Sequence, residues 1–325
     1  MQLFPKKLSQ IYLVLFVSAF LTITGNFTFF QKTLLVYPLS ENWLFLGSLF
    51  FFLFTFLAAL LLLFCYRVTT KPILIALLMI SAIVSYSTNN YGIVFDHNMI
   101  LNTFETDTSE FLDLVSFKSI LYFFIFGLLP SIFVLKVKLK KISFKAQLWE
   151  RIKTFLVLVI IFVIIVLTFS KHYSSFAREN RDLRLYITPT YYLYSATKFV
   201  DSKFATSTKP FKEIGLDAKL NKKSDTRRLV ILVVGETARA DHMSLNGYDR
   251  NTNPYLEKEE IISFDKMTSC GTDTALSVPC MFSLLDRSSY NHAKGKNMSN
   301  VLDIISHAGV SVLWLDNNSS SKSVA

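Results

Sequence analysis

Long apolar runs separated by short polar segments fill the first half of the chain. The runs lie near residues 11–30, 43–66, 72–88, 118–135 and 154–170. A helix needs about 20 consecutive apolar residues to cross the hydrocarbon core of a bilayer, and each run falls close to that length. The pattern predicts five transmembrane helices within residues 1–171. The first run lacks a clear small-residue cleavage site, so we expect an uncleaved anchor rather than a signal peptide.

Two short aliphatic runs lie in the last third of the chain. Leu229 to Val234 is uncharged and rich in β-branched residues, which is typical of a strand buried on both faces of a parallel sheet. Val310 to Leu315 repeats the pattern, after a helix-like stretch from Met298 to Ala308 that ends at Gly309. A strand, a helix and a second strand predict an α/β domain over residues 225–325.

Residues 172–224 connect the apolar half to this predicted domain, and they mix tyrosines with arginines and lysines. Such a mixture suits the headgroup layer of a membrane. We expect short interfacial helices, followed by a polar linker near residues 202–224 that forms the domain boundary.

The basic residues of the first half gather in three of its polar segments: Lys6 and Lys7; Arg67 and Lys71; and Lys136, Lys138, Lys140, Lys141, Lys145, Arg151 and Lys153. Residues 88–117, in contrast, contain five acidic residues and no Lys or Arg. Because short basic loops stay on the cytoplasmic side, we expect a cytoplasmic N-terminus. Because five is an odd number of spans, the chain after about His172 is then expected on the opposite, exported side of the membrane.

Composition supports the membrane assignment. Hydrophobic residues make up 51% of the chain and the mean hydropathy is +0.39, which is too apolar for a soluble protein of this size. The net charge of +10 comes mainly from the basic loop around residues 136–153 and from residues 171–228, both beside the membrane. The sequence has no nucleic-acid motif, so anionic lipid is the favoured counter-charge.

Glu236 directly follows the first aliphatic run and is a candidate metal ligand. An ionised carboxylate at the end of a buried strand must be paired or must bind a metal. The alternative is an ordinary solvated loop carboxylate. The turn that leads to Glu236 holds a single glycine, Gly235, which excludes a dinucleotide fingerprint with three spaced glycines.

A second candidate is the loop SCGTDTALSVPC, residues 269–280. Its hydroxyls, Thr272, Thr274 and Ser277, are all able to cap the helix expected to begin near Thr274. An exported compartment would allow Cys270 and Cys280 to form a disulfide. Closing so short a loop would add about 2–3 kcal/mol in the chain-entropy model. It would also hold a hydroxyl at the N-terminus of a helix, where the partial positive charge favours the binding of phosphate.

Three stretches, VVGETARADHMSLNGY, SCGTDTALSVPCMFS and WLDNNSSSK, follow the five predicted spans. In this arrangement the chain resembles the bacterial phosphoethanolamine transferases that modify lipid A, including the colistin-resistance enzymes. The resemblance implies an exported alkaline-phosphatase-like (sulfatase-like) domain that binds zinc, on an enzyme of the bacterial inner membrane. It also implies transfer of phosphoethanolamine from phosphatidylethanolamine to lipid A through a phosphorylated threonine.

The resemblance assigns roles to two of these candidates. Glu236 matches the zinc-binding glutamate of the family, and Thr274 matches the nucleophile, which also contacts the metal. A threonine hydroxyl is a weak nucleophile until a metal lowers its pKa, and zinc also polarises phosphoryl oxygens. A covalent intermediate predicts ping-pong transfer.

Further matches concern the lipid headgroup. Asn102, Thr106 and Glu110 have a four-residue spacing that places them on one helical face, and Glu110 is suited to pair with an ethanolamine ammonium. The alternative interpretation is that these three residues form the solvated polar face of an interfacial helix. Ser319 and Lys322 match headgroup and phosphate contacts, with an ordinary polar turn as the alternative.

The chain departs from the family in its remaining zinc ligands, an aspartate-histidine pair and a further histidine. None of its histidines stands in those contexts: His97, His172, His242, His292 and His307. If the polypeptide ends at Ala325, we therefore expect it to be inactive, and the sequence is then that of a truncated gene product, an incomplete gene model or a fragment. The rival expectations are a membrane phosphoglycerol transferase or sulfatase-like hydrolase, and a non-catalytic membrane protein. Cys65 is expected to pack as a small apolar residue.

Overall fold

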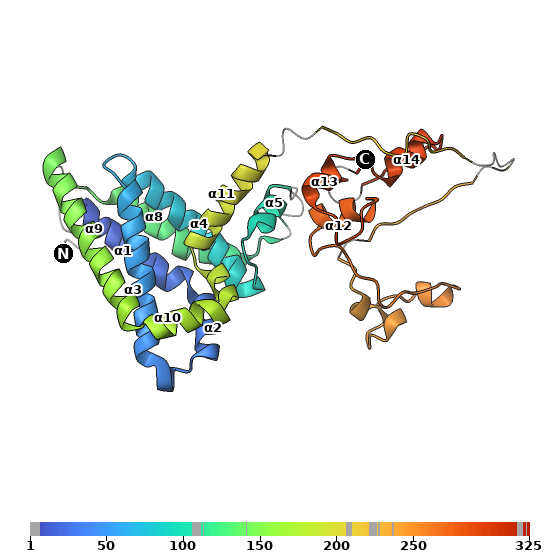
Figure 1. Ribbon diagram of the computed structural model, residues 1–325. Helices are drawn as coiled ribbons and strands as arrows, with labels where there is room; N and C mark the ends of the chain where they lie inside the picture. Colours follow the sequence, from blue (N-terminus) through green and yellow to red (C-terminus); the bar gives the residue numbers. More distant parts are fainter. Residues whose placement is uncertain are drawn as a thin grey trace. The chain divides into compact units, whose positions relative to one another are not determined.

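The computed structural model describes residues 7–105, 112, 114–140, 142–205, 210–220, 226, 228–235, 237–316, 321–322 and 324–325. Its contacts divide the chain into two compact units. Unit 1 consists of Met1–Thr103 and Thr108–Asp201, and unit 2 consists of Phe104–Asp107 and Ser202–Ala325. Figure 1 labels the helices, and each unit is described below by itself.

Unit 1 is built from helices throughout its described part. In chain order these are α1 (Gln10–Gly25), α2 (Phe27–Val36), α3 (Leu39–Phe64), α4 (Thr70–Tyr91), α5 (His97–Glu105), α7 (Phe117–Phe123), the π-helical turn η1 (Phe124–Leu128), α8 (Leu129–Lys136), α9 (Phe144–Thr168), α10 (Ser170–Glu179), the 3₁₀ turn η2 (Arg181–Tyr186) and α11 (Thr190–Ala205).

Four helical segments of the described chain are long and apolar enough to cross a membrane, by length and composition. They are Leu39–Phe64, Thr70–Tyr91, Phe117–Lys136 and Phe144–Thr168. The pair α1 and α2 passes the same test as one span bent by 57°. The prediction of five spans is thus confirmed for four, and for the fifth if the bent pair counts as one.

Two predicted boundaries differ from the structure, one for a local reason and one because of a distant contact. The last span begins at Phe144, about ten residues earlier than the apolar run, because the Ser143 hydroxyl caps the helix by accepting from the Ala146 amide. The first run breaks at Asn26, which is 1% exposed. Its side-chain amide donates to the Thr188 carbonyl at 2.8 Å, and its Oδ1 accepts from the Thr188 amide at 2.9 Å. A buried side chain therefore links the bend to the start of α11.

The core of unit 1 lies between α1, α3 and α4, with contributions from α8, α9 and α11. Leu13, Leu78 and Val134 are fully buried in it, and so is the free Cys65, as expected. Buried hydroxyls bond within their own helices, as when Ser18 donates to the Val14 carbonyl at 2.8 Å. Such internal bonds keep polar groups satisfied in an apolar bundle.

Three polar segments meet at one end of this bundle. The Gln10 side chain donates to the Cys65 carbonyl at 2.8 Å and to the Thr70 hydroxyl at 2.6 Å. The Lys71 ammonium donates to the Leu135 carbonyl at 2.6 Å. The three basic segments of the sequence therefore lie on the same side of the spans, as the predicted topology requires. Which compartment that side faces stays a prediction.

Unit 2 contains short helices joined by long irregular segments (Figure 1). The helices are α12 (Thr274–Met281), α13 (His292–Lys296) and α14 (Val301–His307), with 3₁₀ turns η4 (Ala240–His242), η5 (Ser244–Asn246) and η6 (Leu256–Lys258). A small cluster of buried residues, Val278, Phe282 and Val324, packs against Val234, Leu302 and Trp314. We call this cluster the unit 2 core.

The predicted strands Leu229–Val234 and Val310–Leu315 are not strands in the described chain, which holds isolated bridges but no sheet. Residues 229–233 are 70–86% exposed. A strand of a parallel sheet needs neighbouring strands to satisfy its backbone groups, and the described part of unit 2 supplies none beside these runs. The α/β character of residues 225–325 is therefore not confirmed.

The helix predicted before the second run is present but shorter. It begins at Val301 because the Asn300 side chain accepts from the Leu302 and Asp303 amides, and the Asp303 carboxylate accepts from the Asn300 amide. Gly309 follows it with a φ of +95°, a conformation that favours glycine.

Candidate active site

The loop around Thr274 is closed by a disulfide. Cys270 and Cys280 are bonded, with their Cα atoms 6.3 Å apart. Helix α12 begins at Thr274, and its N-cap is Asp273, whose carboxylate accepts from the Leu276 amide at 2.9 Å. The capping role that Thr272, Thr274 or Ser277 could have filled thus belongs to Asp273. Thr274 is the first residue of the helix.

Gly271 allows the loop to approach the first turn of α12 closely. A Cβ added at Gly271 would lie 2.4 Å from Leu276 Cδ2. The Ser269 hydroxyl also bonds across this residue, donating to the Gly271 carbonyl at 2.7 Å. A side chain at position 271 would therefore push the loop away from the helix that carries Thr274.

Helix α12 is anchored to the unit 2 core by residues in and just after its C-terminal half. Val278 belongs to the unit 2 core, and the Phe282 and Trp314 rings meet edge to face with centroids 5.5 Å apart. The site residue Thr274 therefore stands at the start of a helix whose buried face joins it to the segment that ends near Asp316.

Lys322 belongs to a segment that packs on the same core. Val324 is part of the unit 2 core together with Val278, and its carbonyl accepts from the Asn300 side chain at 2.8 Å. Lys322 itself has a φ of +55°, in the left-handed region that is uncommon for residues other than glycine. The structure thus brings the segments of Thr274 and Lys322 to one cluster, although Ser319 lies outside the described residues.

Glu236 also lies outside the described residues. Its neighbour Thr237 has a φ of +54°, which is unusual for a β-branched residue. The chain therefore turns sharply where the exposed aliphatic run ends.

The predicted headgroup residues of unit 1 begin on α5. Asn102 is half-buried on this helix, while Thr106 and Glu110 lie outside the described residues. Asp96 stabilises the start of α5, since its carboxylate accepts from the Met99 amide at 2.8 Å. The predicted shared face can be followed in the structure only as far as Asn102.

The described residues do not fit a zinc site on their own. Among them, no three His, Cys, Asp or Glu side chains are grouped so that they could hold a metal ion. A stable zinc site takes three or four protein ligands. Of the two ligands that the resemblance assigns, only Thr274 lies in the described part of unit 2.

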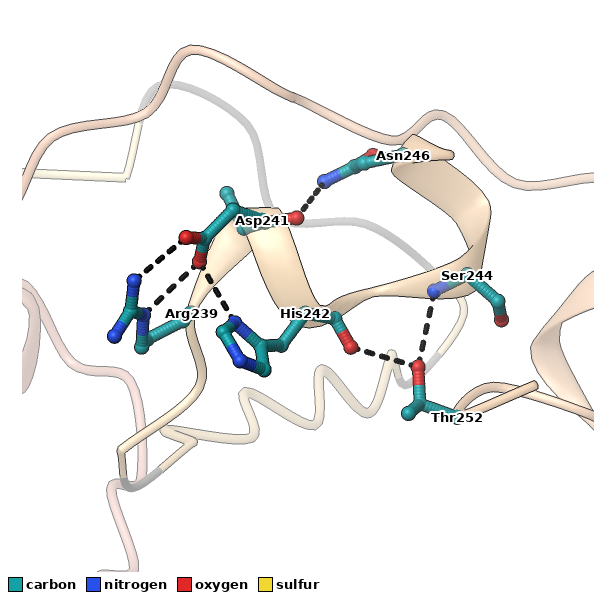
Figure 2. Close-up of polar contacts among 7 residues, drawn as sticks. Arg239, Asp241, His242, Ser244, Asn246 and Thr252 are labelled. Carbon is teal, nitrogen blue, oxygen red and sulfur yellow. Dashed lines mark hydrogen bonds and ion pairs between the residues drawn. The ribbon is translucent and has the colours of Figure 1, made fainter. Parts of the chain in front are cut away.

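A cluster after the first aliphatic run was not recognised as a unit from the sequence (Figure 2). Arg239 donates two hydrogen bonds to the Asp241 carboxylate, at 3.0 and 2.6 Å, and His242 Nδ1 lies 3.0 Å from Asp241 Oδ1. The bonds to Arg239, and then to His242, hold the pKa of Asp241 well below its usual range. The Arg-x-Asp-His spacing of residues 239–242 is the feature of the sequence that could have revealed this cluster.

Thr252 closes the loop that carries this cluster. Its hydroxyl donates to the His242 carbonyl at 2.8 Å and accepts from the Ser244 amide at 3.0 Å, as Figure 2 shows. The His242 and Tyr248 rings also lie with centroids 4.8 Å apart. The Asp241 carboxylate is therefore paired with a residue of its own loop.

Two family models match the chain. Residues 53–204 match the phosphoethanolamine transferase EptA/EptB model, and residues 228–324 match the sulfatase model. A solved structure, the integral membrane protein lipooligosaccharide phosphoethanolamine transferase A (EptA) from Neisseria meningitidis, matches with a TM-score of 0.91 and 31% identity, over 98% of this chain and 60% of that chain. The chain is therefore of the class that joins a membrane domain to a sulfatase-like domain.

Curated relatives narrow the class. The chain is 41% identical to phosphatidylethanolamine transferase Mcr-1 of Escherichia coli, over 99% of this chain and 60% of the relative. It is 32% identical to phosphoethanolamine transferase EptA of Escherichia coli K12, over 95% of this chain and 57% of the relative. The chain is similar to these phosphoethanolamine transferases over nearly all of its own length, and it spans somewhat under two thirds of the length of these relatives.

Proposed function

We propose that the protein transfers phosphoethanolamine from phosphatidylethanolamine to lipid A, with Thr274 as the residue that carries the group between donor and acceptor. The observation that carries this proposal is the disulfide-closed loop in which Asp273 caps α12 and Thr274 opens it. The N-terminus of a helix attracts phosphate because of its unpaired amides and its partial positive charge.

The proposed reaction has two steps. First, Thr274 Oγ forms a bond to the phosphorus of phosphatidylethanolamine, and the bond from phosphorus to the diacylglycerol oxygen breaks. The threonine proton is lost, and the leaving oxygen gains a proton to give diacylglycerol. Second, a phosphate oxygen of lipid A forms a bond to the same phosphorus, and Thr274 Oγ leaves and regains its proton. Splitting one transfer into two is the usual benefit of a covalent intermediate.

The intermediate provides the test. The protein is purified from its native membrane, incubated with isotope-labelled phosphatidylethanolamine and digested for peptide mass mapping. We expect labelled phosphoethanolamine on Thr274, no label in Thr274→Ala, and retained label in the neighbouring control Thr272→Ala. A label on another residue would refute the assignment of Thr274.

The sulfatase match over residues 228–324 favours one competing function, hydrolysis by a sulfatase-like membrane enzyme. A hydrolase would release phosphoethanolamine into water, whereas the proposed transferase passes it to lipid A. Adding lipid A to the labelled protein separates the two. Transfer of label to lipid A supports the proposal, and label appearing only in solution supports hydrolysis.

Donor binding is proposed for Asn102, Thr106 and Glu110 and for Ser319 and Lys322. Support comes from the position of Asn102 on α5 and from the packing of the Lys322 segment on the unit 2 core. We expect Lys322→Ala to raise the concentration of phosphatidylethanolamine needed for half-maximal labelling. Lys258→Ala, which removes an exposed lysine from the same unit, serves as the control.

Zinc is proposed as the cofactor, with Glu236 and Thr274 as the ligands expected from this chain. No step above is assigned to the metal, because the described residues do not form a complete site. Metal analysis of the purified protein tests the proposal independently of activity. Glu236→Gln is expected to lower the zinc content, whereas Glu257→Gln, an exposed carboxylate elsewhere in unit 2, is expected to leave it unchanged.

The proposed location is the bacterial inner membrane, with the N-terminus in the cytoplasm and unit 2 in the periplasm. The convergence of three basic segments at one end of unit 1 supports this orientation. Protease added to spheroplasts should cleave unit 2 and spare the basic end. Cleavage at the basic end in intact spheroplasts would reverse the orientation.

A further inference from the structure

The basic end of unit 1 has a feature that the transfer reaction does not use. Residues 137–143 join the span Phe117–Lys136 to the span Phe144–Thr168, so this short connection must lie at a bilayer surface. A parallel bridge pairs Leu8 with Leu139. The Leu8 amide donates to the Lys138 carbonyl, and the Leu8 carbonyl accepts from the Lys140 amide, both at 2.9 Å.

The bridge sorts the side chains of the connection into two faces. Leu8, Val137 and Leu139 pack against the core of unit 1. Lys7, Lys136, Lys138 and Lys140 are exposed. Neighbours of a bridged residue point away from it, so Lys7 and Lys138 share the outward face. We call these four residues the lysine row.

The lysine row lacks acidic neighbours. Segments 7–10, 65–71 and 135–149 contain no Asp or Glu, so the sequence offers no carboxylate near the row before Glu150. No ion pair of a row lysine is found within the described chain. Several ammonium groups held together without counter-charge repel one another, which an external anion would relieve.

The residues beside the row point to a lipid as the source of that anion. Phe144 and Trp149, at the start of α9, are 56% and 59% exposed. The Lys153 ammonium lies 5.0 Å from the Trp149 ring centroid. Exposed aromatic rings next to lysines are typical of the headgroup layer, where the ring contacts acyl chains and the ammonium contacts phosphate.

We propose that the lysine row binds the headgroup of an anionic phospholipid, at a site separate from the one that takes the phosphatidylethanolamine donor. The bridge to Leu8 fixes the backbone of Lys138 and Lys140, so less freedom is lost when their side chains meet a phosphate. The bound lipid would neutralise this end of the bundle and keep the first span beside the connection before α9.

Native mass spectrometry of the full chain in detergent tests the proposal. The protein is titrated with phosphatidylglycerol and with phosphatidylcholine of the same acyl chains. We expect phosphatidylglycerol to bind more tightly, and added salt to reduce the difference. The triple variant Lys136→Gln, Lys138→Gln, Lys140→Gln should bind phosphatidylglycerol about 100-fold more weakly, since each surface lysine contributes about a factor of five.

Two further variants control for charge and for folding. Lys219→Gln, Lys258→Gln, Lys266→Gln removes the same charge from exposed positions of unit 2 and should keep wild-type binding. Lys136→Arg, Lys138→Arg, Lys140→Arg keeps the charge and should retain the selectivity. Equal binding of the two lipids by the wild type would overturn the proposal. The proposal would also be overturned if the unit 2 triple variant lost as much phosphatidylglycerol binding as the triple variant of the lysine row.

Discussion

Leu78 in unit 1 and Ile231 in unit 2 both stand in uncharged aliphatic stretches, yet Leu78 is fully buried and Ile231 is 76% exposed. A helix satisfies its backbone groups within itself, so α4 needs only neighbouring side chains to bury Leu78. An extended run needs another strand for its backbone before it can bury a side chain. An apolar run alone therefore gives a helix in unit 1, but it does not give a strand in the described part of unit 2.

The largest expected effect is a difference in unfolding free energy between substitutions at Leu78 in unit 1 and at Ile231 in unit 2. Leu78→Ala leaves a cavity in the core of unit 1 and is expected to cost about 2–5 kcal/mol of unfolding free energy. Ile231→Ala, its control, is expected to change stability by less than about 0.5 kcal/mol. Denaturant unfolding in detergent micelles measures both. A comparable loss for Ile231→Ala would show that the run is buried in solution.

The second-largest expected effect is a loss of stability confined to unit 2. Replacing Cys270 and Cys280 with Ser removes the constraint on the Thr274 loop and should cost about 2–3 kcal/mol locally. Hydrogen exchange of residues 271–282 should become faster, while exchange in α3 and α4 should not change. A uniform change in both units would mean that their stabilities are coupled.

A smaller effect is expected from the bend in unit 1. Asn26→Ala leaves the buried amide and carbonyl of Thr188 without these partners, which should cost about 1–3 kcal/mol. Asn42→Ala removes an exposed side chain whose amide donates to the Pro38 carbonyl at 3.2 Å, and it should have little effect. Thermal unfolding of the two variants side by side gives the comparison.

The smallest effect is a change in titration. The depressed pKa of Asp241 means that its contacts contribute stability above the ordinary aspartate pKa and lose it as pH falls through the lower folded value. Arg239→Gln should move this pKa back toward its usual range. Asp286, whose pKa is lowered by hydrogen bonds from Ser289 and Ser288, should not change. Carbon-13 NMR of labelled aspartates follows both; an unmoved Asp241 would contradict the role of Arg239.

Much of unit 1 could be predicted because its information is local. Apolar runs of membrane length identified the spans, and capping by Ser143 explains why the last span begins earlier than its apolar run. The bend could not be predicted, because Asn26 finds its partner, Thr188, 162 residues away in sequence. Nothing near Asn26 in the sequence reveals that contact.

The candidate site likewise combines features that the local sequence predicts with features that depend on distant contacts. The start of a helix at Thr274 followed from its local sequence, but the cap came from Asp273, which was not among the hydroxyls considered. The runs on either side are not strands in the described chain, and a run of β-branched residues could not predict this, because strand pairing depends on segments distant in sequence. The contact between Arg239 and Asp241 was missed, although the two residues are only two positions apart in the sequence.

The Cys270–Cys280 bond has a consequence for how the protein matures. The chain is synthesised with both thiols reduced, and a lasting disulfide requires an oxidising compartment. The loop that carries Thr274 therefore reaches its closed form only after it has met such a compartment. Thiol oxidation would then act as a late assembly step for the loop that carries Thr274.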